Sequence, residues 1–156
     1  MINYQTIMID GICSECGAQS IDNLSCHELF NYPLAWEHND PELYALHFWL
    51  VSCYMIQHPS SFTEEGYKGL LDLFIEAYDN SWDTKYILKK NRQLVKTIKK
   101  IRTSLPNENR QRFKREFSMT IENVYSDGEK KAIQNILSWR ENLRKDIELL
   151  QLREKI

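Results

Sequence analysis

The sequence has little glycine and proline, with 5 Gly and 4 Pro among 156 residues. This scarcity excludes collagen-like and low-complexity chains and disfavours architectures with many β-turns. Long apolar runs are also missing. The longest stretch without Asp, Glu, Lys or Arg, 43–63, contains Ser, Gln, His and Pro, and it is too polar to span a membrane as a helix.

The first ten residues lack the basic start and the apolar stretch of a secretory signal peptide. An apolar fraction of 42% and a charged fraction of 27% are ordinary for a globular protein. We therefore expect a cytoplasmic protein that does not enter a membrane. The length suggests one domain, 1–156, with a Cys-rich knuckle and short helix over 1–38 and a helical bundle over 40–156. Composition alone assigns no reaction.

Charge is distributed unevenly along the chain. Residues 1–84 contain one basic residue against 13 acidic ones, whereas residues 85–116 contain 12 basic residues against two acidic ones. A basic block can bind nucleic acid or an acidic protein partner, or it can face solvent or the acidic half of its own domain. We favour the interpretation that the basic block faces solvent or the acidic half of its own domain. If segment 85–115 binds nucleic acid, the candidate contacts are Lys89, Arg92, Lys96 and Lys99.

Apolar residues recur at helical spacing through most of the chain. Asp40 and Pro41 fit the cap and first position of a helix that ends at His58-Pro59. The stripe from Ile87 to Leu105 predicts one long helix with its lysines outward. A shorter helix is expected from Asp22, ended by Pro33. The expected fold is all-α, a helical bundle of about five to six helices with a small N-terminal Cys-rich knuckle.

The four cysteines are Cys13, Cys16, Cys26 and Cys53. Without a secretory signal, reduced thiols or metal ligation are favoured over disulfides. Cys13 and Cys16 form a C-x-x-C turn, and Gly17 follows it, where glycine allows a positive φ. The two thiolates of such a turn can chelate one zinc ion, and Cys26 is the natural third ligand. A redox pair and unligated thiols are the alternatives. A redox C-x-x-C usually follows a strand in an α/β fold, which this chain lacks.

The fourth ligand must come from a distant segment. We predict His47, because a mid-helix position on the face of Leu43 and Leu50 points its ring inward, where both nitrogens need partners. His58 is the competitor. It lies 11 residues further along, roughly 16 Å along a straight helix, so the two cannot readily share an ion. His58 is also interpreted as a helix C-terminal cap or as a pocket acid, base or ligand. Tyr54 faces the same way as His58.

The segment 40–47 (DPELYALH), Tyr54 and Gln57-His58-Pro59 resemble the central signature of an uncharacterised bacterial family, a domain of unknown function. That family has an N-terminal C-x-x-C-G, a third cysteine and an H…Y-x-x-Q-H-P segment. The similarity extends to 119–124 (MTIENV) and to Trp139. The resemblance implies a small, mostly helical protein with a cysteine-rich N-terminal element, and it implies no activity.

Two positions depart from the family pattern. Members often have Val-Asp where this chain has Val51-Ser52, and a later histidine where this chain has Asp72. A carboxylate can replace an imidazole as a ligand, but Ser52 cannot replace a carboxylate base. Asp72 therefore joins His58 and Tyr54 as a further candidate site residue, and catalysis is less secure here than in the family.

Three functional hypotheses follow. The leading one is a zinc-stabilised helical domain with a binding or scaffolding role, because four protein ligands close the metal to substrate. The second is a metal-dependent hydrolase or transferase with an open coordination position and His58 as a nearby base. The third is nucleic-acid binding through 85–115. No nucleophile elbow, P-loop, dinucleotide fingerprint or H-E-x-x-H motif supports serine catalysis or nucleotide hydrolysis.

Overall fold

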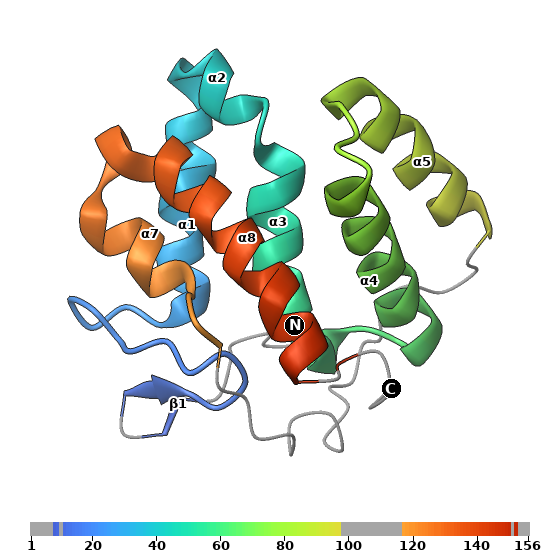
Figure 1. Cartoon of the computed structure of the whole chain (residues 1–156). Coiled ribbons are helices and arrows are strands. Elements are labelled where there is room, and N and C mark those ends of the chain that lie inside the picture. The colour runs from blue at the N-terminus through green and yellow to red at the C-terminus, as the bar shows by residue number, and fades with distance from the viewer. Residues whose placement is uncertain (1–7, 10, 98–116, 151, 153–156) are drawn as a thin grey trace.

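The computed structural model describes residues 8–9, 11–97, 117–150 and 152. Within these ranges the chain forms seven α-helices, three short 3-10 helices and one two-stranded hairpin (Figure 1). The strands are β1 (Met8–Ile9) and β2 (Ile12–Cys13). The helices are α1 (Cys26–Trp36), η1 (Glu37–Asn39), α2 (Pro41–Tyr44), α3 (His47–Ile56), η2 (Pro59–Ser61), α4 (Glu64–Asp79), α5 (Thr84–Thr97), α7 (Ile121–Asp127), η3 (Glu129–Lys131) and α8 (Ala132–Leu149).

The helix α8 crosses the middle of the molecule, with α3 on one side and the pair α1 and α7 on the other (Figure 1). α4 packs against α3, and α5 packs against α4 as the outermost layer. The N-terminal hairpin lies at the end of α1 and α7. This arrangement confirms the all-α bundle with a Cys-rich N-terminal element.

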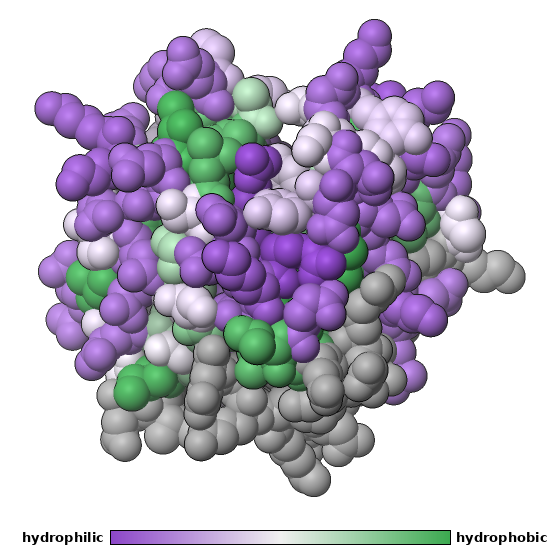
Figure 2. All heavy atoms as spheres, viewed as in Figure 1, coloured by the Kyte–Doolittle hydropathy of each residue, from purple (hydrophilic) through white to green (hydrophobic). Residues whose placement is uncertain are grey.

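The core forms where α3, α4 and α8 meet. Trp139 of α8 and Phe74 of α4 are fully buried, and Trp49 of α3 packs edge-on against Phe74 with ring centroids 5.4 Å apart. Each large apolar side chain buried in this way stabilises the fold by about 1.5–3 kcal/mol. The face shown in Figure 2 is mostly hydrophilic, with apolar side chains gathered in small separate groups. Among the described residues, no helix is long and apolar enough to cross a membrane.

The predicted helix from Asp40 to His58 is two helices. Asp40 does cap α2, because its carboxylate accepts hydrogen bonds from the backbone N–H groups of Glu42 and Leu43, each at 3.2 Å. α2 ends at Tyr44, however, and Leu46 adopts φ −96° and ψ 9° before α3 starts at His47. His47 therefore lies in the first turn of a new helix, and the prediction that it is mid-helix is wrong.

The predicted limits of the first helix are also wrong. Asp22 adopts a left-handed φ of +53° in a turn, and the cap is Ser25, whose hydroxyl accepts from the N–H of Glu28. Pro33 does not end α1, which continues to Trp36. A proline inside a helix costs about 3 kcal/mol, but the buried ring of Pro33 adds to the core and offsets part of this cost.

The long helix expected from residue 85 to 105 is described as far as Thr97, and residues 98–105 lie outside the described ranges. Over the described part, the inward stripe holds. Ile87 is buried, Asn91 and Leu94 are half-buried, and Lys89 and Lys96 are exposed.

Candidate metal centre

The cysteine turn is a small knuckle at the end of the hairpin. The N–H of Gly17 donates to the carbonyl of Cys13 at 2.9 Å, and Gly17 adopts a left-handed φ of +82°, which favours glycine. The N–H of Cys16 points to the sulfur of Cys13 at 3.4 Å, and the N–H of Ala18 points to the sulfur of Cys16 at 3.3 Å. These donors partly neutralise thiolate charge and orient both sulfurs.

Cys26 is the first residue of α1 and is completely buried. A helix N-terminus favours a thiolate over a thiol, because the first backbone N–H groups carry partial positive charge. The hydroxyl of Tyr54 lies 3.7 Å from the Cys26 sulfur. Local sequence explains this placement, since the Ser25 cap fixes where the helix begins.

His58 follows α3 and precedes Pro59. The residue before a proline avoids helical geometry, and His58 adopts φ −131° and ψ 66°. Its Nδ1 donates to the carbonyl oxygen of Tyr54 at 2.6 Å. In the neutral ring, Nε2 then carries the lone pair that can bind a metal. Nε2 lies 3.6 Å from the sulfur of Cys13 and 3.4 Å from that of Cys26.

These four side chains form one buried group. The sulfurs of Cys13, Cys16 and Cys26 and the ring nitrogen of His58 all lie within 4.8 Å of one another, and the group could hold a metal ion. Tetrahedral zinc with ordinary Zn–S and Zn–N bonds separates sulfur from nitrogen by about 3.6 Å. The two distances from Nε2 agree with that value, and the exposed fractions of the four residues are 2%, 2%, 0% and 6%.

His47 lies elsewhere. Its Nδ1 contacts both carboxylate oxygens of Glu37, at 2.8 and 3.0 Å, and its side chain is 48% exposed. His58 therefore takes the place beside the three sulfurs that the sequence prediction gave to His47. The helix-cap interpretation of His58 also describes a real contact, because Nδ1 meets the carbonyl of Tyr54 near the end of α3.

The other candidate residues are spread over the fold. Tyr54 is buried, stacks on His58 with ring centroids 4.1 Å apart and borders the cysteine group. Asp72 is half-buried on α4 and is not part of the group. Cys53 is buried separately. Of the possible nucleic-acid contacts, Lys89, Arg92 and Lys96 are exposed on α5, and Lys99 lies outside the described residues.

Close packing of the thiols shifts their pKa values in opposite directions. Hydrogen bonds from Cys13 and Cys16 lower the pKa of Cys26 far below its usual range. Hydrogen bonds with Cys13 and Cys26, together with burial, raise the pKa of Cys16. Burial opposes charge on His58, but its hydrogen bonds with Cys13 and Cys26 raise its pKa. The geometry thus already favours one thiolate, the form of cysteine that binds metals.

Sequence reasoning missed two buried polar residues that adjoin the group in sequence, Glu15 beside the cysteines and Gln57 beside His58. Glu15, between the two cysteines, is 4% exposed and accepts a hydrogen bond from the N–H of Ser60 at 3.0 Å. Gln57 is completely buried, and its side-chain amide donates to the carbonyl of Met119 at 2.7 Å. Their positions in the sequence could have indicated them, since Glu15 lies inside the C-x-x-C motif and Gln57 begins the Q-H-P motif.

The contact between Gln57 and Met119 joins two of the segments that carry the family signature. A family model described as a family of unknown function, DUF5946, matches residues 11–148. The chain belongs to this family. No curated protein and no solved structure matches it. In this member of DUF5946, the matched range contains all three cysteines of the buried group and His58.

Proposed function

We propose that this chain is a zinc-stabilised helical domain with a binding or scaffolding role in the cytoplasm. One observation carries the proposal. His58 is anchored through Nδ1 to the carbonyl of Tyr54. Its Nε2 lies 3.6 and 3.4 Å from the sulfurs of Cys13 and Cys26, which is the separation between two ligand atoms of one tetrahedral zinc ion. Such an anchored imidazole with a free second nitrogen is the usual arrangement of a zinc-binding histidine.

The donor set supports zinc in a structural role. Three thiolates and one imidazole fill a tetrahedral zinc site, so no position is left for substrate or water. The burial of all four donors fits the same role. The cysteines of the group form no disulfide, which fits the cytoplasm, where thiols are kept reduced.

In this arrangement the metal would join three separate parts of the chain. Cys13 ends strand β2 and Cys16 lies in the turn that follows it. Cys26 begins α1, and His58 follows α3. The two-stranded hairpin is too small to be stable alone. Zinc binding would supply the free energy that fixes it to the bundle.

The same geometry weighs against the enzymatic alternative. A hydrolase that uses His58 as a base needs a free Nε2, but this nitrogen faces two sulfurs. Nucleic-acid binding through 85–115 stays a prediction that rests on charge, with exposed Lys89, Arg92 and Lys96 on α5.

Metal analysis of the untagged protein tests the proposal. We expect one zinc ion per chain, and cobalt substitution should give the charge-transfer absorption of thiolate ligands with tetrahedral ligand-field bands. Cys13→Ser, Cys16→Ser, Cys26→Ser and His58→Ala should lose metal. Cys53→Ser and His47→Ala are matched controls, because they change the same residue types outside the group.

The wild-type measurements do not depend on whether the variants fold. A protein purified without zinc that neither binds added zinc nor gives a thiolate–cobalt spectrum would refute the proposal. An open coordination position occupied by water, detected by X-ray absorption spectroscopy, would shift the assignment to a catalytic metal.

A further inference from the structure

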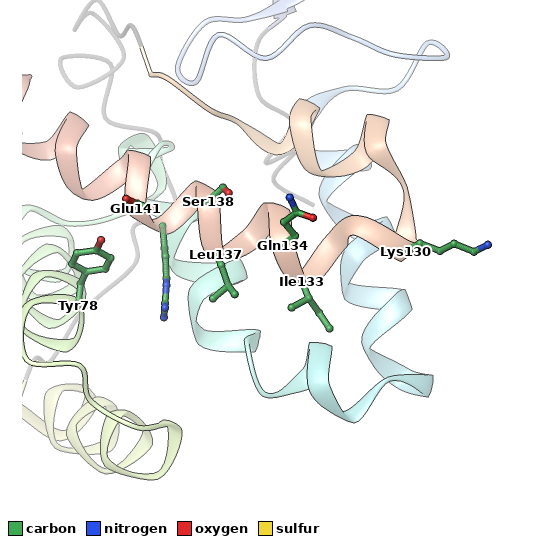
Figure 3. Close-up of a pocket in the computed structure, with 8 residues that line it drawn as sticks. Tyr78, Lys130, Ile133, Gln134, Leu137, Ser138 and Glu141 are labelled. Carbon is green, nitrogen blue, oxygen red and sulfur yellow. The ribbon is translucent and has the colours of Figure 1, made fainter.

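A depression on the described surface lies along α8 and measures about 540 Å³. Figure 3 shows that the residues lining it do not converge. Ile133, Gln134 and Leu137 point in different directions along α8, Lys130 extends away from η3, and Tyr78 comes from α4. This depression has no centre at which a ligand would meet several groups.

A smaller cleft of about 250 Å³ is built differently. Its walls come from four helices, with Tyr44 of α2, Val51 of α3, Leu70 of α4 and Leu88 of α5 among them. The lining is mainly apolar, and among the described residues it includes no Lys, Arg, Asp or Glu. One end is fixed by the hydroxyl of Thr84, which donates to the carbonyl of Ala45 at 3.2 Å.

His47 also lines this cleft. Its ring is held by a buried partner, because Glu37 is only 7% exposed and both its carboxylate oxygens contact Nδ1. Burial raises the pKa of Glu37, and the hydrogen bond with His47 counteracts that effect. With Nδ1–H donated to the carboxylate, Nε2 of the neutral ring is a hydrogen-bond acceptor.

The described lining carries no charged side chain, so an anion would find no cationic partner inside the cleft. The Glu37 carboxylate lies behind His47 and disfavours an anion at that end, and the basic side chains of α5, such as Lys89 and Arg92, are exposed and outside the lining. An apolar lining in turn disfavours a strongly solvated cation. The ligand that fits is uncharged, with an apolar body and one donor for Nε2.

We propose that the cleft between α3 and α5 binds a small uncharged aromatic or alicyclic alcohol, whose hydroxyl donates to Nε2 of His47. Pockets for drug-sized ligands measure roughly 300–1,000 Å³, so a cleft of about 250 Å³ takes a molecule of about one ring. The two exposed apolar side chains Tyr44 and Leu88, 63% and 45% exposed, stand at its rim, where a ligand would cover them. This site is separate from the cysteine group and does not depend on zinc in its chemistry.

Three matched compounds test the proposal on the full chain, in a buffer of about pH 8, where imidazole and phenols are ordinarily neutral. They are 4-ethylphenol, its methyl ether 4-ethylanisole, and the anion 4-ethylbenzoate. Ligand-observed NMR and backbone chemical shifts measure binding and its location. We expect 4-ethylphenol to bind about tenfold more tightly than the ether, the value of one hydrogen bond, and the benzoate to bind most weakly.

Two pairs of variants locate the site. His47→Ala should remove the preference for the phenol over its ether, whereas His38→Ala, on an exposed histidine outside the lining, should preserve it. Ala45→Trp should block the mouth of the cleft, whereas Ala35→Trp, on exposed α1 surface, should not. Both changes are at exposed positions, and zinc content and circular dichroism check that each variant is folded.

Several outcomes would overturn the proposal. They are no binding of 4-ethylphenol, equal binding of phenol and ether, tighter binding of the benzoate, or a phenol preference that survives His47→Ala. Shift changes confined to the surface along α8 would likewise place the ligand elsewhere. None of these outcomes affects the zinc proposal, which metal analysis tests on its own.

Discussion

The carboxylate of Glu15 accepts a hydrogen bond from the backbone N–H of Ser60 at 3.0 Å, and both residues are buried. Glu15 lies between Cys13 and Cys16, and Ser60 lies two residues after His58. The hydrogen bond therefore connects directly the two segments that bring thiols and imidazole together. It fixes the distance between donors that are 45 residues apart in the sequence.

Glu15→Ala should weaken zinc binding and destabilise the fold. The N–H of Ser60 would be left buried without its acceptor, which costs about 1–3 kcal/mol. Loss of such a supporting contact typically lowers metal affinity 10- to 100-fold. Competition with a chromophoric chelator measures the affinity, and urea unfolding measures the stability. Glu76→Ala, at an exposed position of α4, is the control, and equal effects of the two variants would contradict this role of Glu15.

The cysteines should differ in reactivity once zinc is removed. In the zinc-loaded protein we expect none of the four to be alkylated rapidly, because three are ligands and Cys53 is fully buried. Burial raises the pKa of the Cys53 thiol, with a smaller opposing effect of Arg140. After chelation, iodoacetamide followed by peptide mass spectrometry should show modification of Cys13, Cys16 and Cys26 ahead of Cys53. Rapid alkylation of Cys13 in the zinc-loaded protein would argue against metal ligation.

The sequence predicts the three cysteines of the buried group, but it does not predict that His58 is the histidine beside them. Cys13, Cys16 and Cys26 are close in sequence, so their spacing alone indicates a shared site. Helical periodicity likewise predicts the bundle, because apolar stripes must be buried whatever their partners. The choice of histidine depends on where one helix ends and the next begins.

A continuous helix from residue 40 to 58 would have directed His47 inward. The chain instead turns at Leu46, which places His47 at the exposed start of α3 and His58 just beyond its end. No strong local signal marks this break, since neither glycine nor proline occurs between Tyr44 and His47. Tertiary packing of α2 and α3 decides it, and that information is not local.

The carboxylate of Asp146 should be a main anchor of the segment before α7. It is 3% exposed and accepts hydrogen bonds from the N–H and the hydroxyl of Ser118, both at 2.7 Å. Asp146→Asn preserves size but places an amide donor against these donors, so we expect a loss of about 1–3 kcal/mol in urea unfolding. Glu148→Gln, at a position 64% exposed, should change stability by no more than about 0.5 kcal/mol. If Asp146→Asn left the stability unchanged, solvent would be able to replace the carboxylate as the acceptor.

The basic face of α5 should contribute little to stability. Lys96 is exposed, so Lys96→Glu should change the free energy of unfolding by at most about 0.5 kcal/mol. A loss of several kcal/mol would show that this face is paired with the acidic half of the chain. The combined Lys89→Glu, Arg92→Glu and Lys96→Glu variant then tests nucleic-acid binding. If that binding exists, it should weaken with salt and be lost in this variant.

The hydroxyl of Tyr54 should affect the zinc affinity of the site without being required for zinc binding. It lies 3.7 Å from the sulfur of Cys26, where it can donate to a metal-bound thiolate, and its ring stacks between Phe30 and His58 with centroid distances of 4.1 Å. Tyr54→Phe keeps both stacking contacts and removes only the donor. We therefore expect zinc to remain bound with an affinity about tenfold lower, measured by chelator competition, and the thiolate–cobalt absorption to shift because the sulfur of Cys26 loses a hydrogen bond. Tyr86→Phe, on the outer helix α5, is the control and should leave both unchanged. Complete loss of zinc in Tyr54→Phe would mean that the hydroxyl holds the cysteine in place, whereas an unchanged spectrum would mean that it does not contact the thiolate.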